Sequence, residues 1–130
     1  MDSKWFYNWE GKSVLVVEDD PINFNYLDAL LKPTMAKVYH AEKGEDAIEL
    51  YRKISFFNVV LMDIRLPGIT GLETTRQLIA MNKNIVVIAQ TAYAEEWDRQ
   101  AAFEAGCCDF IAKPIRANEM FELIKKYLNA

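Results

Sequence analysis

The chain has 130 residues, of which 52% are hydrophobic and 26% charged, as expected for one globular domain. The formal net charge of −4 argues against nucleic acid and anionic membrane surfaces as partners. No apolar run approaches the ~20 residues of a membrane span, and no secretory signal pattern is present, so we expect a cytoplasmic protein. The two cysteines, Cys107 and Cys108, are adjacent, which argues against a structural disulfide and agrees with a reducing compartment.

The first twelve residues differ from the rest of the chain. They contain four aromatic side chains without strand or helix periodicity: Trp5, Phe6, Tyr7 and Trp9. We therefore divide the chain into an aromatic lead-in segment, residues 1–12, and a domain, residues 13–130. The aromatic side chains either cover the local core or form a partner site, and the sequence leaves both open.

Within the domain, short β-branched apolar runs alternate with helical patterns. Five runs are predicted strands: Val14–Val17, Lys37–His40, Val59–Met62, Ile85–Ala89 and Phe110–Ala112. Three segments between or after them carry a regular apolar helix face, and two carry a less regular one: 22–30, 47–54 and 120–128, then 72–81 and 95–105. Pro21 suits a first helical turn with Asp20 as its N-cap. Five successive βα units predict an α/β fold, a doubly wound five-stranded parallel sheet with helices on both faces.

Ligands of such folds bind at the carboxyl ends of the strands. Four of the five predicted strands end in polar side chains that carry chemistry: Glu18 and Asp19, Asp63, Thr91, and Lys113. The second strand ends at His40 and offers little. Clustered carboxylates repel one another unless a cation is present, and Mg²⁺ prefers oxygen ligands of this kind. Lys113 and Thr91 would then face a phosphoryl group, with Asp63 as its nucleophilic acceptor.

Each of these residues also has a purely structural interpretation. The acidic residues before Pro21 could serve only as N-cap and helix-dipole partners. Asp63 precedes a Pro-Gly loop and could form a turn, and an isolated Thr91 or Lys113 could lie at the surface. The position of all of them at strand ends of one sheet favours a shared site.

Four stretches give a more specific indication: VLVVEDDPIN, VVLMDIRLPGITGLE, VVIAQTAYA and AGCCDFIAKPI. Together they make the chain from Lys12 to Leu128 resemble the receiver domain of response regulators in two-component phosphorelays. The resemblance implies a flavodoxin-like sheet of order 2-1-3-4-5 with five helices. It also implies Mg²⁺-dependent transfer of a phosphoryl group to Asp63 from a histidine kinase or histidine phosphotransfer domain, making the protein a phosphoacceptor switch and not an enzyme.

The resemblance further assigns roles to single residues. It makes Glu18, Asp19, Asp63 and the Arg65 backbone carbonyl the Mg²⁺ ligands. It makes Lys113 a phosphoryl contact that precedes a cis Pro114. Thr91 and Phe110 would be the switch residues, and Phe110 lacks the hydroxyl of the tyrosine found in other receivers. Arg65 and Tyr93 would flank the path of the attacking water, and because both are bulky we expect slow dephosphorylation. Gln90 stands where an apolar residue is commoner.

The output surface implied by the resemblance covers residues 94–105 and 110–128, and a homodimer through this surface is an open alternative.

Two other functions would use a similar fold. A phosphatase of the haloacid dehalogenase type would need a second Asp where Arg65 stands. A flavin binder would need a Ser/Thr/Gly-rich loop in place of EDDPIN. The intact acidic and basic residues argue against a degenerate receiver. The wording of the motifs leans towards a hybrid sensor kinase, and a stand-alone protein stays open.

Overall fold

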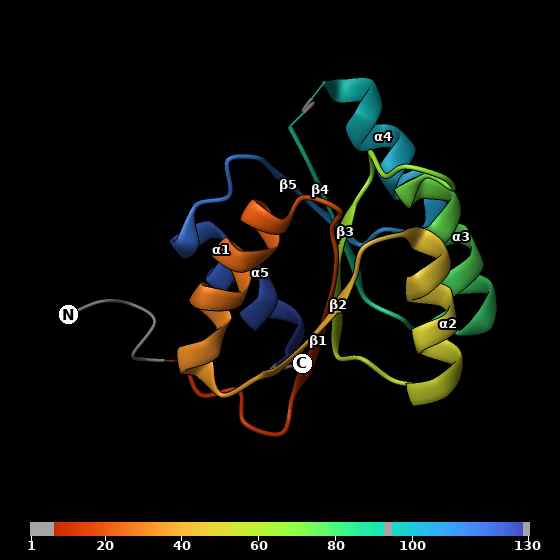
Figure 1. Cartoon of the computed structure of the whole chain (residues 1–130). Coiled ribbons are helices and arrows are strands. Elements are labelled where there is room, and N and C mark those ends of the chain that lie inside the picture. Colours follow the sequence, from red (N-terminus) through yellow and green to blue (C-terminus); the bar gives the residue numbers. More distant parts are fainter. Residues whose placement is uncertain (1–6, 93–94, 129–130) are drawn as a thin grey trace.

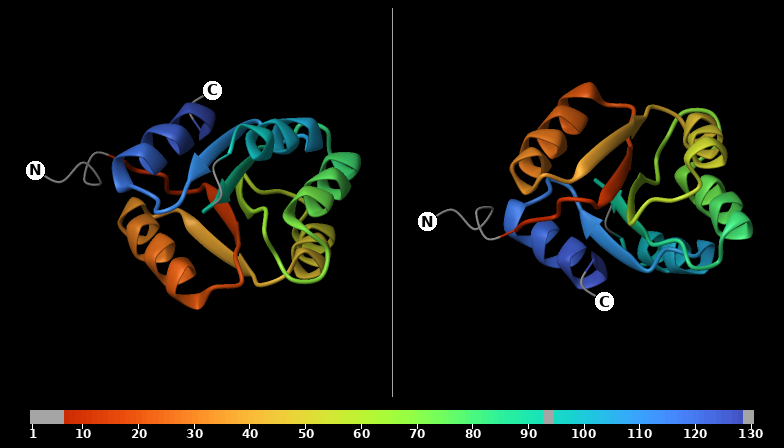
Figure 2. Two further views of the ribbon diagram at one scale, coloured as in Figure 1. Left: turned by 90° about the horizontal axis from the view of Figure 1, so that it is seen from above. Right: turned by 90° about the horizontal axis from the view of Figure 1, so that it is seen from below.

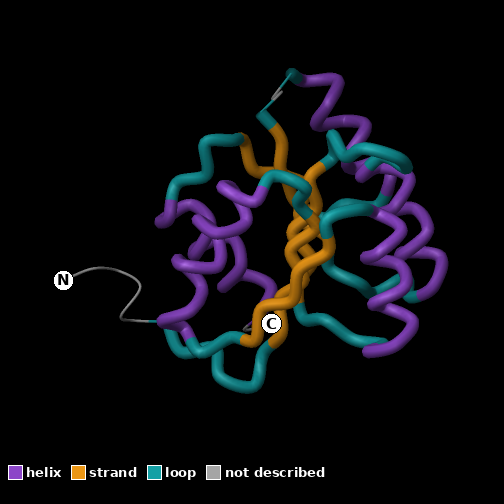
Figure 3. Tube along the Cα trace, in the orientation of Figure 1, coloured by secondary structure: helices purple, strands orange, loops and turns teal. Residues whose placement is uncertain are grey.

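The computed structural model describes residues 7–92 and 95–128, which form a parallel sheet between two layers of helices (Figures 1 and 3). The sheet has five strands: β1 (Ser13–Val17), β2 (Lys37–Ala41), β3 (Val59–Asp63), β4 (Val87–Thr91) and β5 (Asp109–Ala112). The helices are α1 (Pro21–Leu31), the 3₁₀-helix η2 (Lys32–Thr34), α2 (Gly44–Ile54), α3 (Gly71–Met81), α4 (Glu96–Ala105) and α5 (Ala117–Leu128). The predicted alternation of strands and helices is confirmed.

The strand order is β2-β1-β3-β4-β5 and every pairing is parallel, as predicted. Helices α1 and α5 cover one face of the sheet, and α2, α3 and α4 cover the other (Figures 1 and 2). All five strands therefore end at the same edge, where the loops that carry the candidate residues begin. No helix in residues 7–92 and 95–128 is both long and apolar enough to cross a bilayer.

The helix boundaries follow from local chemistry. Asp20 caps α1 by accepting a hydrogen bond from the Ile22 N–H at 3.0 Å, as predicted. Thr70 caps α3 in the same way, and α4 ends at Gly106, whose φ of 115° lies in the left-handed region. Strand β4 begins two residues later than predicted, because the Ile85 N–H donates to the Asn82 carbonyl in the turn after α3.

Two apolar cores lie on the two faces of the sheet, because alternate residues of each strand point to opposite sides. Residues of the lead-in segment join the core beneath α1 and α5. Trp9 is buried, and its ring and that of Tyr7 lie 5.9 and 5.0 Å from the ring of Phe121 in α5. This part of the segment thus covers local core, whereas Trp5 and Phe6 lie outside the described residues.

Candidate functional site

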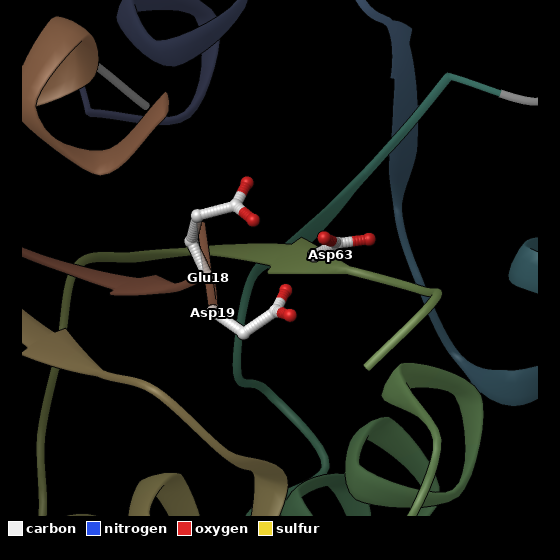
Figure 4. Close-up of side chains that lie close together, drawn as sticks. All are labelled: Glu18, Asp19 and Asp63. Atoms are coloured by element: carbon white, nitrogen blue, oxygen red, sulfur yellow. The ribbon is translucent and has the colours of Figure 1, made fainter. Parts of the chain in front are cut away.

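Three carboxylates gather at the carboxyl ends of β1 and β3. Each of Glu18, Asp19 and Asp63 offers an oxygen within 4.8 Å of the others, and the side chains of the first two extend from β1 towards β3 (Figure 4). Glu18 and Asp63 are buried, whereas Asp19 is exposed to solvent. The site is therefore an acidic cluster that is exposed to water at Asp19.

Asp63 is held in place through both carboxylate oxygens. The Arg65 N–H donates to Oδ1 at 2.9 Å, and the Lys113 ammonium donates to Oδ2 at 3.2 Å. Asp63 is only 4% exposed, so strand β3 ends in a buried carboxylate. Such a group is costly without partners, and these two bonds supply them.

Lys113 bridges two of the acids, because its ammonium also lies 2.9 Å from Glu18 Oε1. Burial lowers the pKa of Lys113, but the hydrogen bonds and negative charges of Glu18 and Asp63 outweigh burial and raise it above its ordinary value. The ammonium therefore stays charged. The peptide bond before Pro114 is cis, as predicted.

The residues present fit a hard divalent cation. Among the described residues, three carboxylates face one ammonium, that of Lys113, which leaves a net negative charge when all four groups are ionised. All three acids offer oxygen atoms, and exposed Asp19 leaves room for the water ligands that Mg²⁺ retains. Whether the Arg65 carbonyl joins them stays a prediction.

Two residues that sequence reasoning missed hold Glu18. The Asn23 amide donates to Glu18 Oε1, and His40 Nε2 lies 2.8 Å from the Glu18 carbonyl oxygen. The expectation that the second strand offers little is therefore wrong for His40, whose ring also stacks on Phe24 with centroids 3.7 Å apart. Each contact joins two different elements of the fold, so no local sequence pattern predicts it.

The two predicted switch residues lie at the far side of the site. Thr91 is buried at the end of β4, and its carbonyl accepts the Lys113 N–H at 2.8 Å. The ring of Phe110 packs on the core beneath α3 and α4, with the Arg99 guanidinium 5.7 Å from its centroid. Their switching role stays a prediction.

Arg65 connects the site to α4. Its guanidinium lies 3.2 Å from Asp98 Oδ1 and 5.9 Å from the ring centroid of Trp97. Asp98 is 3% exposed, and no described residue donates to its second oxygen. Sequence reasoning missed Asp98, because an acid in a first helical turn ordinarily needs only the helix dipole to explain it. Tyr93, the other predicted control on dephosphorylation, lies outside the described residues.

Gln90 and the cysteines complete the surroundings. Gln90 is fully buried in β4 beside Asp63 and Ile111, and within the described part of the chain neither polar atom of its side chain finds a partner. Cys107 is buried and Cys108 exposed, and both are free thiols. Burial raises the pKa of Cys107 to about 11, which makes this thiol a poor nucleophile.

Comparison with known proteins agrees with this geometry. The family model of the response regulator receiver domain matches residues 14–125. The polar-differentiation response regulator DivK of Brucella ovis is 35% identical over 119 residues, which cover 90% of this chain and 96% of DivK.

Solved structures show the same likeness. The receiver domain of sensor histidine kinase PA1611 from Pseudomonas aeruginosa, with a magnesium ion in its active site cleft, is 29% identical with a TM-score of 0.84. The match covers 92% of this chain and 98% of that one. A putative response regulator from Chloroflexus aurantiacus is 27% identical, with a TM-score of 0.86 and the same coverage.

Proposed function

Because the chain belongs to the response regulator receiver domain family, we propose that it accepts a phosphoryl group on Asp63 from a phosphohistidine of a partner protein. The membership makes it a domain of two-component signalling, a phosphoacceptor switch and not a classical enzyme. The observation that carries the finer proposal is the pairing of buried Asp63 with Lys113 within a cluster of three carboxylates. The same pairing, together with the family membership, argues against the phosphatase and flavin-binding alternatives.

In the proposed transfer, a carboxylate oxygen of Asp63 forms a bond to phosphorus while the bond from phosphorus to the donor imidazole nitrogen breaks. The electron pair of that bond stays on the imidazole. Most of the catalysis in such transfers comes from positioning and charge stabilisation. The Arg65 N–H fixes the orientation of the Asp63 carboxylate, and the Lys113 ammonium lies where negative charge develops on the phosphoryl oxygens.

Glu18, Asp19, Asp63 and the Arg65 carbonyl are the residues that would hold Mg²⁺. When bound, the ion neutralises the carboxylates and the phosphoryl oxygens, which lets two anionic partners approach each other. The Asn23 amide and the His40 ring fix Glu18, so they orient this ligand. Thr91 would donate its hydroxyl to the transferred group. The surface of α4, β5 and α5 would carry the output, with homodimerisation as the alternative use.

A shallow pocket next to the acidic site suits the donor. It is lined by Asp20, Ile22, Asn23, Tyr26, Pro114 and Ile115. Ile22 is 79% exposed and so presents an apolar side chain at the edge of this pocket. A domain that brings a phosphohistidine to Asp63 must cover the rim of the site, and this apolar rim suits the packing of a histidine kinase or histidine phosphotransfer domain.

Acetyl phosphate with Mg²⁺ tests the acceptor. We expect labelling of the parent, detected by mass spectrometry of the intact protein, and none in Asp63→Asn. Asp46→Asn, which removes an exposed acid of α2, is the control and should label normally. Labelling of Asp63→Asn at the parental rate would refute the assignment.

The donor surface is tested with Ile22→Asp. We expect this variant to lose transfer from a phosphorylated histidine phosphotransfer domain while keeping normal labelling by acetyl phosphate, because the small donor does not use the pocket. Equal loss with both donors would mean that the substitution damages the site itself.

A further inference from the structure

We infer that Asp98 is a positioning residue for Arg65, and that their ion pair joins α4 to the phosphoacceptor site only while Asp63 is unphosphorylated. The inference rests on the proposed phosphorylation of Asp63. It gives α4 a direct connection to the site that is independent of Thr91 and Phe110.

The first support is the position of Arg65. Its backbone N–H contacts Asp63 Oδ1 at 2.9 Å, while its guanidinium lies 3.2 Å from Asp98 Oδ1. One residue therefore contacts the phosphoacceptor with its main chain and α4 with its side chain. The Arg65 side chain is 48% exposed, so it can turn without repacking the core.

The second support is the burial of Asp98. Its side chain is 4% exposed, and among the described residues its Oδ2 has no hydrogen-bond donor. The guanidinium of Arg65 is thus a major source of compensation for this carboxylate. Removal of one partner from a buried ion pair leaves an uncompensated charge, which is strongly unfavourable.

Phosphorylation changes this balance. A phosphoryl group brings a charge of about −2 and three acceptor oxygens to the residue that the Arg65 main chain already contacts. Guanidinium groups bind phosphoryl oxygens in a bidentate manner, so the phosphoryl group competes with Asp98 for Arg65. Once Arg65 turns, the Asp98 carboxylate must reach water, which requires the first turn of α4 to move. Trp97 lies beside the guanidinium and would report the change.

Beryllofluoride with Mg²⁺ is the probe, and tryptophan fluorescence is the readout. We expect the parent to show a fluorescence change that is lost in Trp97→Phe. Because the ion pair opposes binding in the parent, Asp98→Asn should bind beryllofluoride about 5-fold more tightly. Arg65→Gln should not gain affinity, since it loses the phosphoryl contact together with the ion pair. Glu104→Gln, an exposed acid on the same helix, should match the parent.

Parental affinity in Asp98→Asn, or equal tightening in Asp98→Asn and Arg65→Gln, would overturn the inference. Hydrogen exchange on the parent tests it without any variant. Beryllofluoride should speed exchange of the amides in residues 96–100 at least several-fold, and unchanged exchange there would also overturn it. Failure of the parent to bind beryllofluoride and to label with acetyl phosphate would instead refute the proposed function.

Discussion

Gly71 packs directly against the main chain of Asp63. A Cβ atom built on Gly71 would lie 2.1 Å from the Asp63 carbonyl oxygen and 2.5 Å from the Ile64 Cα. Both neighbours are backbone atoms, so they cannot move aside as a flexible side chain could. The first residue of α3 thus fixes how closely that helix approaches the end of β3, and with it the position of Asp63.

We predict that Gly71→Ala destabilises the domain and slows labelling of Asp63. Alanine ordinarily stabilises a helix by up to about 1 kcal/mol over glycine, so a loss here reports the clash with the Asp63 backbone. The expected decrease in the free energy of unfolding is about 2 kcal/mol, measured by urea denaturation.

Gly11→Ala is the comparison for that experiment. Its φ of 84° strains any side chain, but among the described residues no atom outside the two chain neighbours lies within 4 Å of the added Cβ. We expect a cost of about 1 kcal/mol and normal labelling by acetyl phosphate. A Gly71→Ala variant as stable and as readily labelled as the parent would show that β3 and α3 can separate freely.

Much of this arrangement could be predicted from the sequence. The apolar runs of a doubly covered sheet are continuous, and the parallel order brings their carboxyl ends together, so the positions of Glu18, Asp63 and Lys113 along the chain suffice to place them in one site. The contacts of His40 and Asp98 could not be predicted. Each reaches a different element, and neither residue departs from what a strand end or a first helical turn commonly contains.

The lead-in segment shows a second limit. Its aromatic residues have no period, because Trp9 fills a gap on α5 as an isolated side chain and belongs to no helix or strand. The sequence therefore left core and partner site equally open for it. Gln90 shows a third limit, since a glutamine inside an apolar strand indicates only that something unusual stands there.

Gln90 supports a prediction about stability. A buried polar group without a partner costs about 1–3 kcal/mol, and both polar atoms of the Gln90 side chain are in this state among the described residues. We expect Gln90→Met, which keeps the length of the side chain, to raise the free energy of unfolding by about 1 kcal/mol in urea titrations. Gln100→Met on the exposed side of α4 should change it by less than about 0.5 kcal/mol. A destabilised Gln90→Met would show that the amide makes hydrogen bonds after all.

The raised pKa of Cys107 leads to a prediction about how stability changes at alkaline pH. Burial raises the pKa of this thiol from 9.0 to about 11 in the folded protein. The unfolded chain therefore releases the thiol proton at a lower pH than the folded protein does. The resulting contribution of Cys107 to the free energy of unfolding is complete below pH 9 and is lost as the pH rises from 9 towards 11. Over this pH range we expect the free energy of unfolding to fall less steeply in Cys107→Ala than in the parent. The difference between the two decreases should reach about 2 kcal/mol at the upper end of the range. Tyr127, whose pKa is also raised by burial and by Asp109, acts equally in both proteins and cancels.

Cys108→Ala is the companion variant, because Cys108 is exposed at the surface, although burial raises its pKa as well. We expect its pH profile to stay closer to that of the parent, and iodoacetamide to modify Cys108 well before Cys107 in the folded protein. Parallel profiles for Cys107→Ala and the parent between pH 9 and 11 would contradict the assignment.

Arg65 also predicts the lifetime of the phosphorylated state. The Arg65 N–H binds Asp63 Oδ1 at 2.9 Å, and we propose that its side chain flanks the path of the attacking water once Asp63 is phosphorylated. A guanidinium there both occupies the path of the water and contacts the phosphoryl oxygens. We expect Arg65→Ala to shorten the half-life of the aspartyl phosphate about 10-fold, which corresponds to about 1.4 kcal/mol in the barrier. The decay is followed by ³¹P NMR after removal of acetyl phosphate, and Arg52→Ala, which replaces an exposed arginine of α2, should decay like the parent.

Because Asp98→Asn frees Arg65 for the phosphoryl group, the half-life of the aspartyl phosphate in this variant should be as long as that in the parent or longer. An unchanged half-life in Arg65→Ala would exclude Arg65 from the control of hydrolysis and leave Tyr93→Ala as the variant to measure.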